Sequence, residues 1–269
     1  MDAASTFYLA LKIGVAAMIT LWAVSVPKRD ASLVDLWWGP GFSVAAVVVW
    51  AFSGAPLTTP ALVALALVIA WSARLGALMA RRRRRHPGED PRYTALRKAW
   101  DPGFWWKSLG VVFLLQAVIQ WVVAFPAMAA ASTATGALGV IGVLGAAVAL
   151  GGLAVETVAD NQLDAHRARH GSGSVCTTGL RAHVRYPNYL GEIAFWWGFW
   201  LIALDSGAWW SLVSPVLITF LLVKVSGAPM LEERLGDGRP GFAEWKARTP
   251  AFLPRFGRSA AAAGGQPGE

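Results

Sequence analysis

The chain has 269 residues, of which 55% are hydrophobic and only 15% are charged, and its formal net charge is +8. Soluble domains carry about a quarter charged residues, so this composition excludes an ordinary water-soluble globule and an intrinsically disordered chain. The one cysteine, Cys176, excludes a disulfide framework and thiolate-rich metal sites. The composition therefore indicates an integral membrane protein.

Seven apolar stretches follow one another, and each approaches the roughly 20 residues that cross a hydrocarbon core about 30 Å thick. We expect transmembrane helices over residues 6–26, 33–53, 60–80, 108–128, 137–157, 188–204 and 208–228. The first stretch lacks a basic segment before it and a small-residue cleavage site, so we interpret it as part of the fold and not as a signal peptide. The predicted fold is an all-α integral membrane protein, with one seven-helix domain over residues 1–257 and a disordered tail over residues 258–269.

The basic residues indicate on which side of the membrane each connector lies. The connectors 1–5, 53–59, 129–136 and 205–207 carry no Lys or Arg, whereas the connectors that alternate with them are strongly basic. The positive-inside rule therefore places the N-terminus outside and the C-terminus in the cytoplasm. We interpret the pentad Arg81–Arg85 as an anchor at anionic lipid headgroups and not as a nucleic-acid patch.

The fifth apolar stretch carries small residues at every third or fourth position. They are Gly139, Gly142, Gly145, Ala149 and Gly152. Small side chains let helix backbones approach closely in a membrane, so we expect this helix to pack tightly against a neighbour.

A few charged residues fall inside the apolar stretches. They are Lys12, Asp35, Arg74, Glu156, Glu192 and Lys224. A charge in the bilayer costs a few kcal/mol, so each of these positions is a candidate functional site. Apart from Lys12, all lie in the cytoplasmic half under the predicted topology, which indicates one polar cavity that opens to the cytoplasm.

Two of these charges allow two interpretations each. Asp35 precedes two tryptophans and either caps the second helix or belongs to a functional site. Trp71 and Arg74 lie one helical turn apart, and Arg74 either extends to the headgroups or contributes to the cavity.

The fifth helix is expected to leave the membrane with a polar face, because Glu156, Asp160, Asp164 and Arg167 are spaced four, four and three residues apart. One interpretation is a solvated face with pairs inside the helix. The other is that Asp160, Asn161 and Arg167 bind a polar nucleotide at the cytoplasmic mouth.

Pro187 suits the first turn of a helix, so the sixth helix is expected to begin there with its N-terminus facing the cytoplasm. Its free backbone N–H groups and positive dipole end favour a phosphate. Asn188 and Glu192 share one face, and Arg185 lies just before them. The alternative is that Asn188 is a capping residue and Glu192 a first-turn carboxylate.

Several common signatures are absent. The sequence has no Gly-x-Gly-x-x-Gly after a strand and no Walker loop. His166 and His170 lie four residues apart, but no acidic or sulfur ligand joins them, so we predict no metal site.

Taken together, these segments resemble the steroid 5α-reductase family, in its bacterial branch with the DUF1295-type motif set. The matching segments are VDLWWG (34–39), WxxRLG (71–76), GEDPRY (88–93), ExxADxQL (156–163), GL (179–180), RxPNYxGE (185–192), SG…LEE (226–233) and TPAFLP (249–254). Their order and spacing cover about residues 33–256, so the resemblance is specific as a set.

The resemblance implies a monomeric seven-helix reductase in the bacterial inner (cytoplasmic) membrane, surrounded by membrane lipids, with its cofactor site facing the cytoplasm and no nucleic-acid partner. It implies NADPH as cofactor, and reduction of the C4–C5 double bond of a 3-oxo-Δ4-steroid or a related enone lipid that enters from the bilayer. Hydride addition to the β-carbon builds negative charge on the ketone oxygen, so an acid beside that oxygen in a dry site lowers the barrier.

The same resemblance assigns residues to roles. The expected cofactor-binding residues are Arg74, Arg92, Asp160, Asn161, Arg167, Arg185, Asn188, Tyr189 and Glu192. The expected catalytic residues are Asp35, Trp71 and Glu192. Asp35 stands where the family usually carries Glu, Trp71 where it carries a tyrosine, and Tyr186 where many relatives carry His.

Two other functions stay open. A methyltransferase of the isoprenylcysteine carboxyl type shares the Arg-x-Pro-x-Tyr-x-Gly-Glu stretch and the closing Glu-Glu segment, and would use S-adenosylmethionine. A non-catalytic sterol- or lipid-binding protein is the third possibility.

Overall fold

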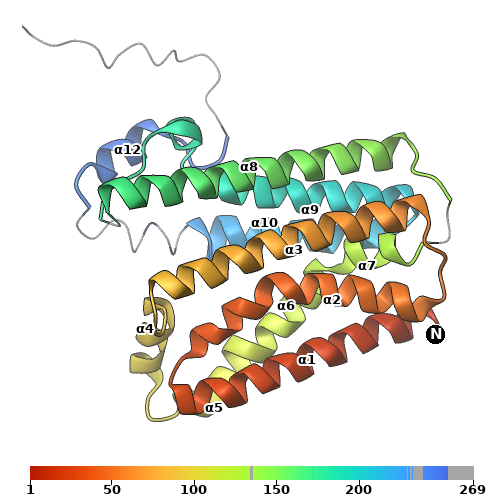
Figure 1. Ribbon diagram of the computed structural model, residues 1–269, viewed down its shortest axis with the longest axis horizontal. Coiled ribbons are helices and arrows are strands. Elements are labelled where there is room, and N and C mark those ends of the chain that lie inside the picture. Colours follow the sequence, from red (N-terminus) through yellow and green to blue (C-terminus); the bar gives the residue numbers. More distant parts are fainter. Residues whose placement is uncertain (134–135, 172, 229, 231, 233–238, 254–269) are drawn as a thin grey trace, which may run out of the picture. The chain divides into compact units, whose positions relative to one another are not determined.

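The computed structural model describes residues 1–133, 136–171, 173–228, 230, 232 and 239–253, and the regular elements within them are helices (Figure 1). They are α1 (Ala3–Lys28), η1 (Ala31–Val34), α2 (Asp35–Ser53), α3 (Thr59–Arg85), α4 (Pro91–Trp100), α5 (Phe104–Ser108), η2 (Leu109–Leu114), α6 (Leu115–Val123), α7 (Phe125–Ala131), α8 (Val140–His170), η3 (Gly179–Ala182), α9 (Pro187–Asp205), η4 (Trp209–Leu212), α10 (Val213–Phe220), η5 (Leu221–Val225) and α12 (Phe242–Arg248). The predicted tail over residues 258–269 lies outside the described residues.

The chain divides into two compact units. Unit 1 comprises Met1–Leu153 and Ile193–Thr219, and unit 2 comprises Ala154–Glu192 and Phe220–Glu269. The long helices α8 and α9 each contribute residues to both units.

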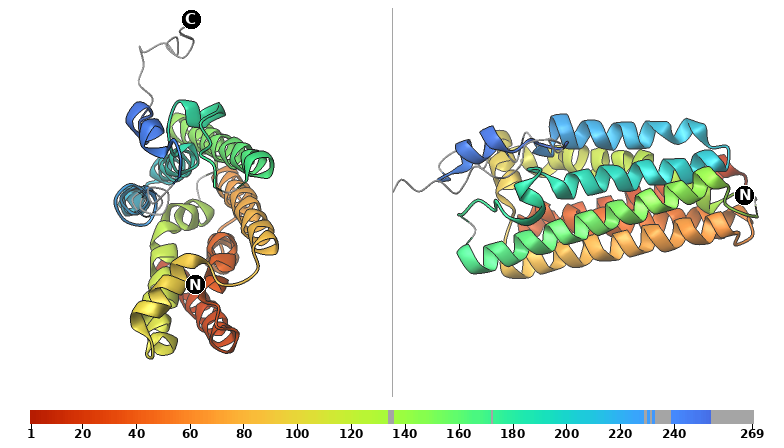
Figure 2. Two further views of the ribbon diagram at one scale, coloured as in Figure 1. Left: turned by 90° about the vertical axis from the view of Figure 1, so that its left-hand side faces the viewer. Right: turned by 90° about the horizontal axis from the view of Figure 1, so that it is seen from above.

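Unit 1 is a bundle of long helices. In this unit α2 packs against both α1 and α3, α7 packs against α2 and α3, and α6 packs against α1 (Figures 1 and 2). The amino group of Met1 donates to the carbonyl oxygen of Phe52 at 3.1 Å, so the chain begins at the end of the bundle where α2 ends. At the opposite end, α4 lies beside the start of α2 and the end of α3 (Figure 1).

Within the described residues, five helical stretches are long and apolar enough to cross a membrane. They are Ala3–Lys28, Ala31–Ser53, Thr59–Arg85, Phe104–Val123 and Val140–His170. The apolar stretch Trp209–Val225 is shorter, and α9 is not among the five. The helices indicate a membrane protein and confirm the predicted all-α class.

The predicted continuation of the fifth helix past residue 157 is confirmed, because α8 runs through the polar residues Glu156 to Arg167 and ends at His170, where Gly171 adopts a φ of 78°. The fourth stretch differs from the prediction of 108–128. It begins at Phe104 and ends at Val123, and α7 follows as a separate helix after Ala124. The hydropathy profile alone did not show where that helix ends.

Glycine lets α8 and α9 approach closely inside unit 1. A Cβ on Gly145 would lie 2.7 Å from the carbonyl oxygen of Gly198 and 2.8 Å from the backbone nitrogen of Ile202. A Cβ on Gly198 would lie 2.5 Å from the backbone nitrogen of Ala149. The predicted close packing of the fifth helix through its small residues is therefore confirmed.

The Gly39-Pro40-Gly41 stretch does not break the second helix, since α2 runs through it. A Cβ on Gly39 would lie 2.9 Å from the carbonyl oxygen of Ser72, so this glycine allows α3 to approach α2. Pro40 lacks an N–H, and beside it the side chain of Gln120 from α6 donates to the carbonyl oxygens of Trp37 and Trp38 at 3.2 and 2.7 Å.

Candidate functional site

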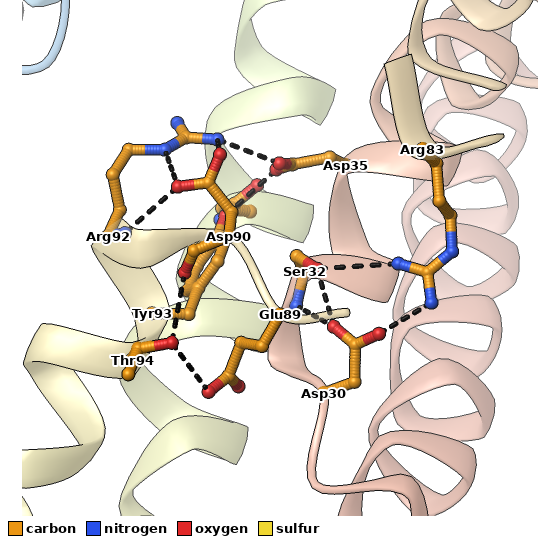
Figure 3. A network of polar contacts seen from close by, with 10 residues as sticks. Asp30, Ser32, Asp35, Arg83, Glu89, Asp90, Arg92, Tyr93 and Thr94 are labelled. Carbon is orange, nitrogen blue, oxygen red and sulfur yellow. Dashed lines mark hydrogen bonds and ion pairs between the residues drawn. The ribbon is translucent and has the colours of Figure 1, made fainter. Parts of the chain in front are cut away.

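A polar network surrounds Asp35 at the first residue of α2 (Figure 3). The hydroxyl of Tyr93 donates to Oδ1 of Asp35 at 2.8 Å, and Nη2 of Arg92 donates to Oδ2 at 2.9 Å. The helix has no side-chain cap, because its N-cap residue is Val34. The interpretation of Asp35 as a helix cap is therefore wrong, and the structure brings Asp35 and Arg92, both predicted site residues, into contact.

The segment Gly88–Tyr93 positions these donors. Asp90 caps α4, since its Oδ1 accepts from the backbone N–H of Arg92 at 2.9 Å, and Pro91 occupies the first helical position. The same oxygen accepts from Nε of Arg92 at 3.0 Å, which directs the guanidinium toward Asp35. The cap at Asp90 therefore sets both the start of α4 and the direction of the Arg92 side chain.

Two further carboxylates fix the backbone around Asp35. Glu89 accepts from the backbone N–H of Ala31 at 2.8 Å and from Nη2 of Arg97 at 2.7 Å. Asp30 caps η1 and forms an ion pair with Arg83 of α3. Burial opposes ionisation of Asp30, but the hydrogen bonds from Arg83 and Ser32 outweigh it and lower the pKa of this carboxyl. Both carboxylates therefore hold the turn that leads into α2.

The electrostatic environment keeps Tyr93 protonated. Its side chain is buried, with 8% of the residue exposed. Burial, followed by the negative charge of Asp35, raises the pKa of the Tyr93 hydroxyl above its ordinary value. Burial disfavours the charge on Arg92, but Asp35 outweighs this effect and raises the pKa of the guanidinium. The network thus combines a neutral O–H donor with a permanent cation, a set that can stabilise negative charge developing on an oxygen.

Trp71 lies in an aromatic cluster of unit 1 and not in the Asp35 network. Its ring stacks on Phe195 at 5.3 Å between centroids and meets the rings of Phe42 and Trp196 edge-on. All four side chains are fully buried. Arg74 follows one turn later on α3 and is half-buried.

In unit 2, the predicted face of α8 forms as one continuous helix. Glu156 and Asp160 are buried, whereas Asn161 and Arg167 are exposed. A solvated face therefore does not describe the first two positions. Arg167 remains accessible to a ligand from solvent.

Residues Gly179 and Leu180 contact the side chain of Gln162 on α8. Gly179 has a φ of 62°, and a Cβ there would lie 2.3 Å from Oε1 of Gln162. That oxygen accepts from the backbone N–H of Leu180 at 2.9 Å. The motif that contains Gln162 and the motif that contains Gly179 therefore pack directly against each other.

A second network joins the Arg-Tyr-Pro-Asn stretch to the C-terminal segment. Arg185 and Tyr186 both donate to Oε1 of Glu232, at 2.7 and 3.0 Å, and Lys246 pairs with the other carboxylate oxygen. The backbone N–H groups of Arg185 and Tyr186 donate to the carbonyl oxygens of Pro250 and Ala251. Arg185, predicted to bind a cofactor, is therefore engaged within this unit.

The first turn of α9 holds the remaining predicted residues. The Oδ1 atom of Asn188 accepts from Nη2 of Arg181 at 3.2 Å. The ring of Tyr189 stacks on that of Tyr186 at 5.7 Å, and Glu192 is half-buried one turn further on. The sequence analysis missed Tyr93, Arg181 and Glu232; the first and last lie in recognised motifs, and Arg181 lies in none.

Glu232 makes a pH-dependent contribution to stability that can be measured. Burial opposes its charge, but hydrogen bonds from Lys246, Arg185 and Tyr186 outweigh it and lower the pKa of Glu232 from its ordinary value of 4.5. A lowered pKa adds stability above the ordinary pKa, and that stability is lost as the pH falls through the lowered value. We expect Glu232→Gln to cost about 2 kcal/mol at neutral pH and to flatten the loss of stability in acid.

Thermal unfolding in detergent between pH 3 and 7 measures this effect. Glu244→Gln, an exposed glutamate on α12, is the matched control and should behave as the wild type. If the melting temperature of Glu232→Gln falls with pH as that of the wild type does, Glu232 does not cause the loss of stability in acid.

Among the described residues, no group of three or more His, Cys, Asp or Glu side chains is arranged to hold a metal ion. No curated protein and no solved structure matches the chain. The family model described as "Protein of unknown function (DUF1295)" matches residues 21–249, and this family is related to steroid 5α-reductase-like proteins. Because the match covers most of the chain, the protein belongs to the DUF1295 family.

Proposed function

We propose that the protein is an intramembrane NADPH-dependent reductase of the C4–C5 double bond of 3-oxo-Δ4-steroids or related enone lipids. The observation that carries this proposal is the contact of Asp35 with Tyr93 and Arg92 at the start of α2. Such a donor set has a clear use in enone reduction, where the ketone oxygen gains negative charge.

The proposed reaction depends on the protonated hydroxyl of Tyr93. Bound NADPH would supply the hydride, which goes to the β-carbon of the enone. The hydroxyl of Tyr93 is kept protonated by its surroundings and exchanges its hydrogen bond to Asp35 for one to the ketone oxygen when substrate binds, while Arg92 stays paired with Asp35. The enolate then takes a proton from solvent water at the α-carbon, so that hydride and proton together complete the reduction of the double bond. Tyr93 thus takes the role that the family resemblance assigned to position 71.

The residues of unit 2 suit a phosphorylated dinucleotide. Arg167 is an exposed cation near the end of α8, and Asn188 lies in the first turn of α9, where backbone N–H groups favour phosphate. We assign Asp160, Asn161, Tyr189 and Glu192 to the same cofactor. Arg185 has its main partners within the unit and is assigned a supporting role.

We further propose seven membrane crossings, with the N-terminus outside and the C-terminus in the cytoplasm of a bacterial inner membrane. The five long apolar helices, the helix Trp209–Val225 and α9 supply the seven segments. Basic residues such as Lys28 and Arg81–Arg85 lie at helix ends on the proposed cytoplasmic side.

Ligand titration of the purified, detergent-solubilised protein tests the proposed function. We expect NADPH to bind, NADH to bind more weakly and S-adenosylmethionine not to bind, and NADPH to be oxidised when an enone such as a 3-oxo-Δ4-steroid is added. Binding of S-adenosylmethionine instead would identify a methyltransferase. Binding of sterol with neither cofactor would identify a lipid-binding protein.

Arg167→Ala is expected to weaken NADPH binding about tenfold and to reduce the preference over NADH, because an arginine paired with the 2′-phosphate contributes only to NADPH. Arg169→Ala is the matched control, since Arg169 is also exposed but lies on another side of α8. If the preference stays intact in Arg167→Ala, the 2′-phosphate binds elsewhere.

A further inference from the structure

Arg181 is a buried cation in unit 2 that no motif accounts for. Only 5% of the residue is exposed, and it lies in η3, between Gly179 and the start of α9. Its Nη1 donates to the carbonyl oxygen of Arg185 at 2.7 Å and its Nη2 to the amide oxygen of Asn188 at 3.2 Å. Both acceptors are electrically neutral.

The guanidinium has unused capacity for an anion. Its Nε–H is buried and has no hydrogen-bond partner among the described residues. A buried arginine ordinarily pairs with a carboxylate or a bound anion, because a desolvated charge with neutral partners is costly. Burial lowers the pKa of Arg181, against the opposing effect of charges that include Asp160 on α8. The cation is thus only partly compensated.

The N-terminus of α9 lies next to this cation. Asn188, which accepts from Arg181, is the second residue of α9. The first backbone N–H groups of an α-helix have no partner within the helix, and the helix dipole places partial positive charge there. A buried cation with an unpartnered donor beside a helix N-terminus has the chemistry of a phosphate site.

We propose that Arg181 and the first turn of α9 form a binding site for the phosphate of an organic ligand. If the proposed function is correct, and this identification rests on it, the phosphate belongs to the dinucleotide cofactor. The same chemistry occurs in the headgroup of an anionic phospholipid. Arg181 acts as the charged donor, and Asn188 holds it in place.

The first measurement is calorimetric titration of the protein in nanodiscs with inorganic pyrophosphate and with 2′,5′-ADP. We expect both to bind the wild type and both affinities to fall about tenfold in Arg181→Gln. Arg169→Ala, an exposed arginine on α8, serves as the matched control and should bind as the wild type does. The lipid source is tested by the change in melting temperature between nanodiscs with and without phosphatidic acid.

Asn188→Asp keeps the site testable if loss of Arg181 prevents folding. This variant places a carboxylate against Arg181 at the helix N-terminus, so it supplies the missing anion from within the protein. We expect it to lose pyrophosphate and 2′,5′-ADP binding while its melting temperature stays the same or rises. If Asn188→Asp raises the melting temperature and still binds both as the wild type does, Arg181 is a structural residue and the proposal is overturned.

The outcomes separate this site from the proposed function. If pyrophosphate binding depends on Arg181 but NADPH does not bind, the phosphate site stands and the reductase proposal fails. If NADPH binds equally to the wild type and to Arg181→Gln, the reductase proposal stands and the phosphate site fails. Stabilisation by phosphatidic acid that depends on Arg181, without nucleotide binding, identifies the lipid headgroup. Absence of any phosphate-dependent effect in the wild type overturns the site.

Discussion

Asp35→Asn is expected to lower the turnover of enone about 100-fold while the affinity for NADPH stays near that of the wild type. Asp35 accepts from two donors, Tyr93 and Arg92, on its two oxygens. An asparagine keeps one acceptor, and its NH2 group would face one of those donors, so at least one hydrogen bond is lost. Tyr93 then loses the contact that positions its hydroxyl for the ketone.

Single-turnover oxidation of NADPH with a 3-oxo-Δ4-steroid, followed by absorbance, measures this effect. Asp205→Asn is the matched control, because Asp205 is also a carboxylate of unit 1 that accepts from a distant segment, the backbone N–H of Gly139 at 2.7 Å, and it lies outside the Asp35 network. That control should lower thermal stability and leave turnover in place. Tyr93→Phe should reproduce the loss seen in Asp35→Asn, and unchanged turnover in both variants would exclude this network from the mechanism.

Gly145→Ala is expected to destabilise unit 1 by about 3 kcal/mol or more, although alanine favours a helix over glycine. The added Cβ would lie 2.7 Å from the carbonyl oxygen of Gly198 and 2.8 Å from the backbone nitrogen of Ile202. Both are backbone atoms, so the clash is relieved only by separating α8 from α9. Such separation loses packing along the shared contact.

Gly151→Ala provides a close comparison on the same helix. Nothing lies within 4 Å of a Cβ built on Gly151, so this variant should be as stable as the wild type or slightly more stable. Thermal unfolding and the yield of monodisperse protein in detergent compare the two variants. Equal melting temperatures would show that α8 and α9 are not in close contact at Gly145.

The sequence was sufficient to predict the helical class and the approximate positions of the long helices, because hydropathy over about 20 residues reflects the thickness of a bilayer. The spacing of the polar residues from Glu156 to Arg167 also predicted that the fifth helix continues beyond its apolar stretch, as α8 does up to His170. Hydropathy was less informative at the fourth stretch, because α6 ends at Val123 although residues 124–128 are still apolar. Hydropathy also cannot distinguish α9, which begins with Asn188 and carries Glu192, from a helix at the membrane surface.

For the candidate site, sequence spacing identified residues close together on one element but not contacts between elements. Asp35 and Arg92 were predicted separately, and only the fold shows that they meet. Tyr93 follows Arg92 directly, yet its role depends on the turn of α4 that directs its hydroxyl toward α2. Arg181 gave no signal, because an arginine in a basic connector resembles every other cytoplasmic arginine in the sequence.

The contact of Gln120 with α2 bears on how the bundle selects one arrangement of its helices. In lipid, apolar side chains pack almost equally well against one another and against acyl chains, so they discriminate weakly between alternative rotations of a helix. Gln120 is 4% exposed, and among the described residues its side-chain amide donates to the carbonyl oxygens of Trp37 and Trp38. Any slide or rotation of α6 would leave a buried amide without partners. One polar side chain thus fixes the depth and orientation of α6, which leucine at that position would leave undetermined.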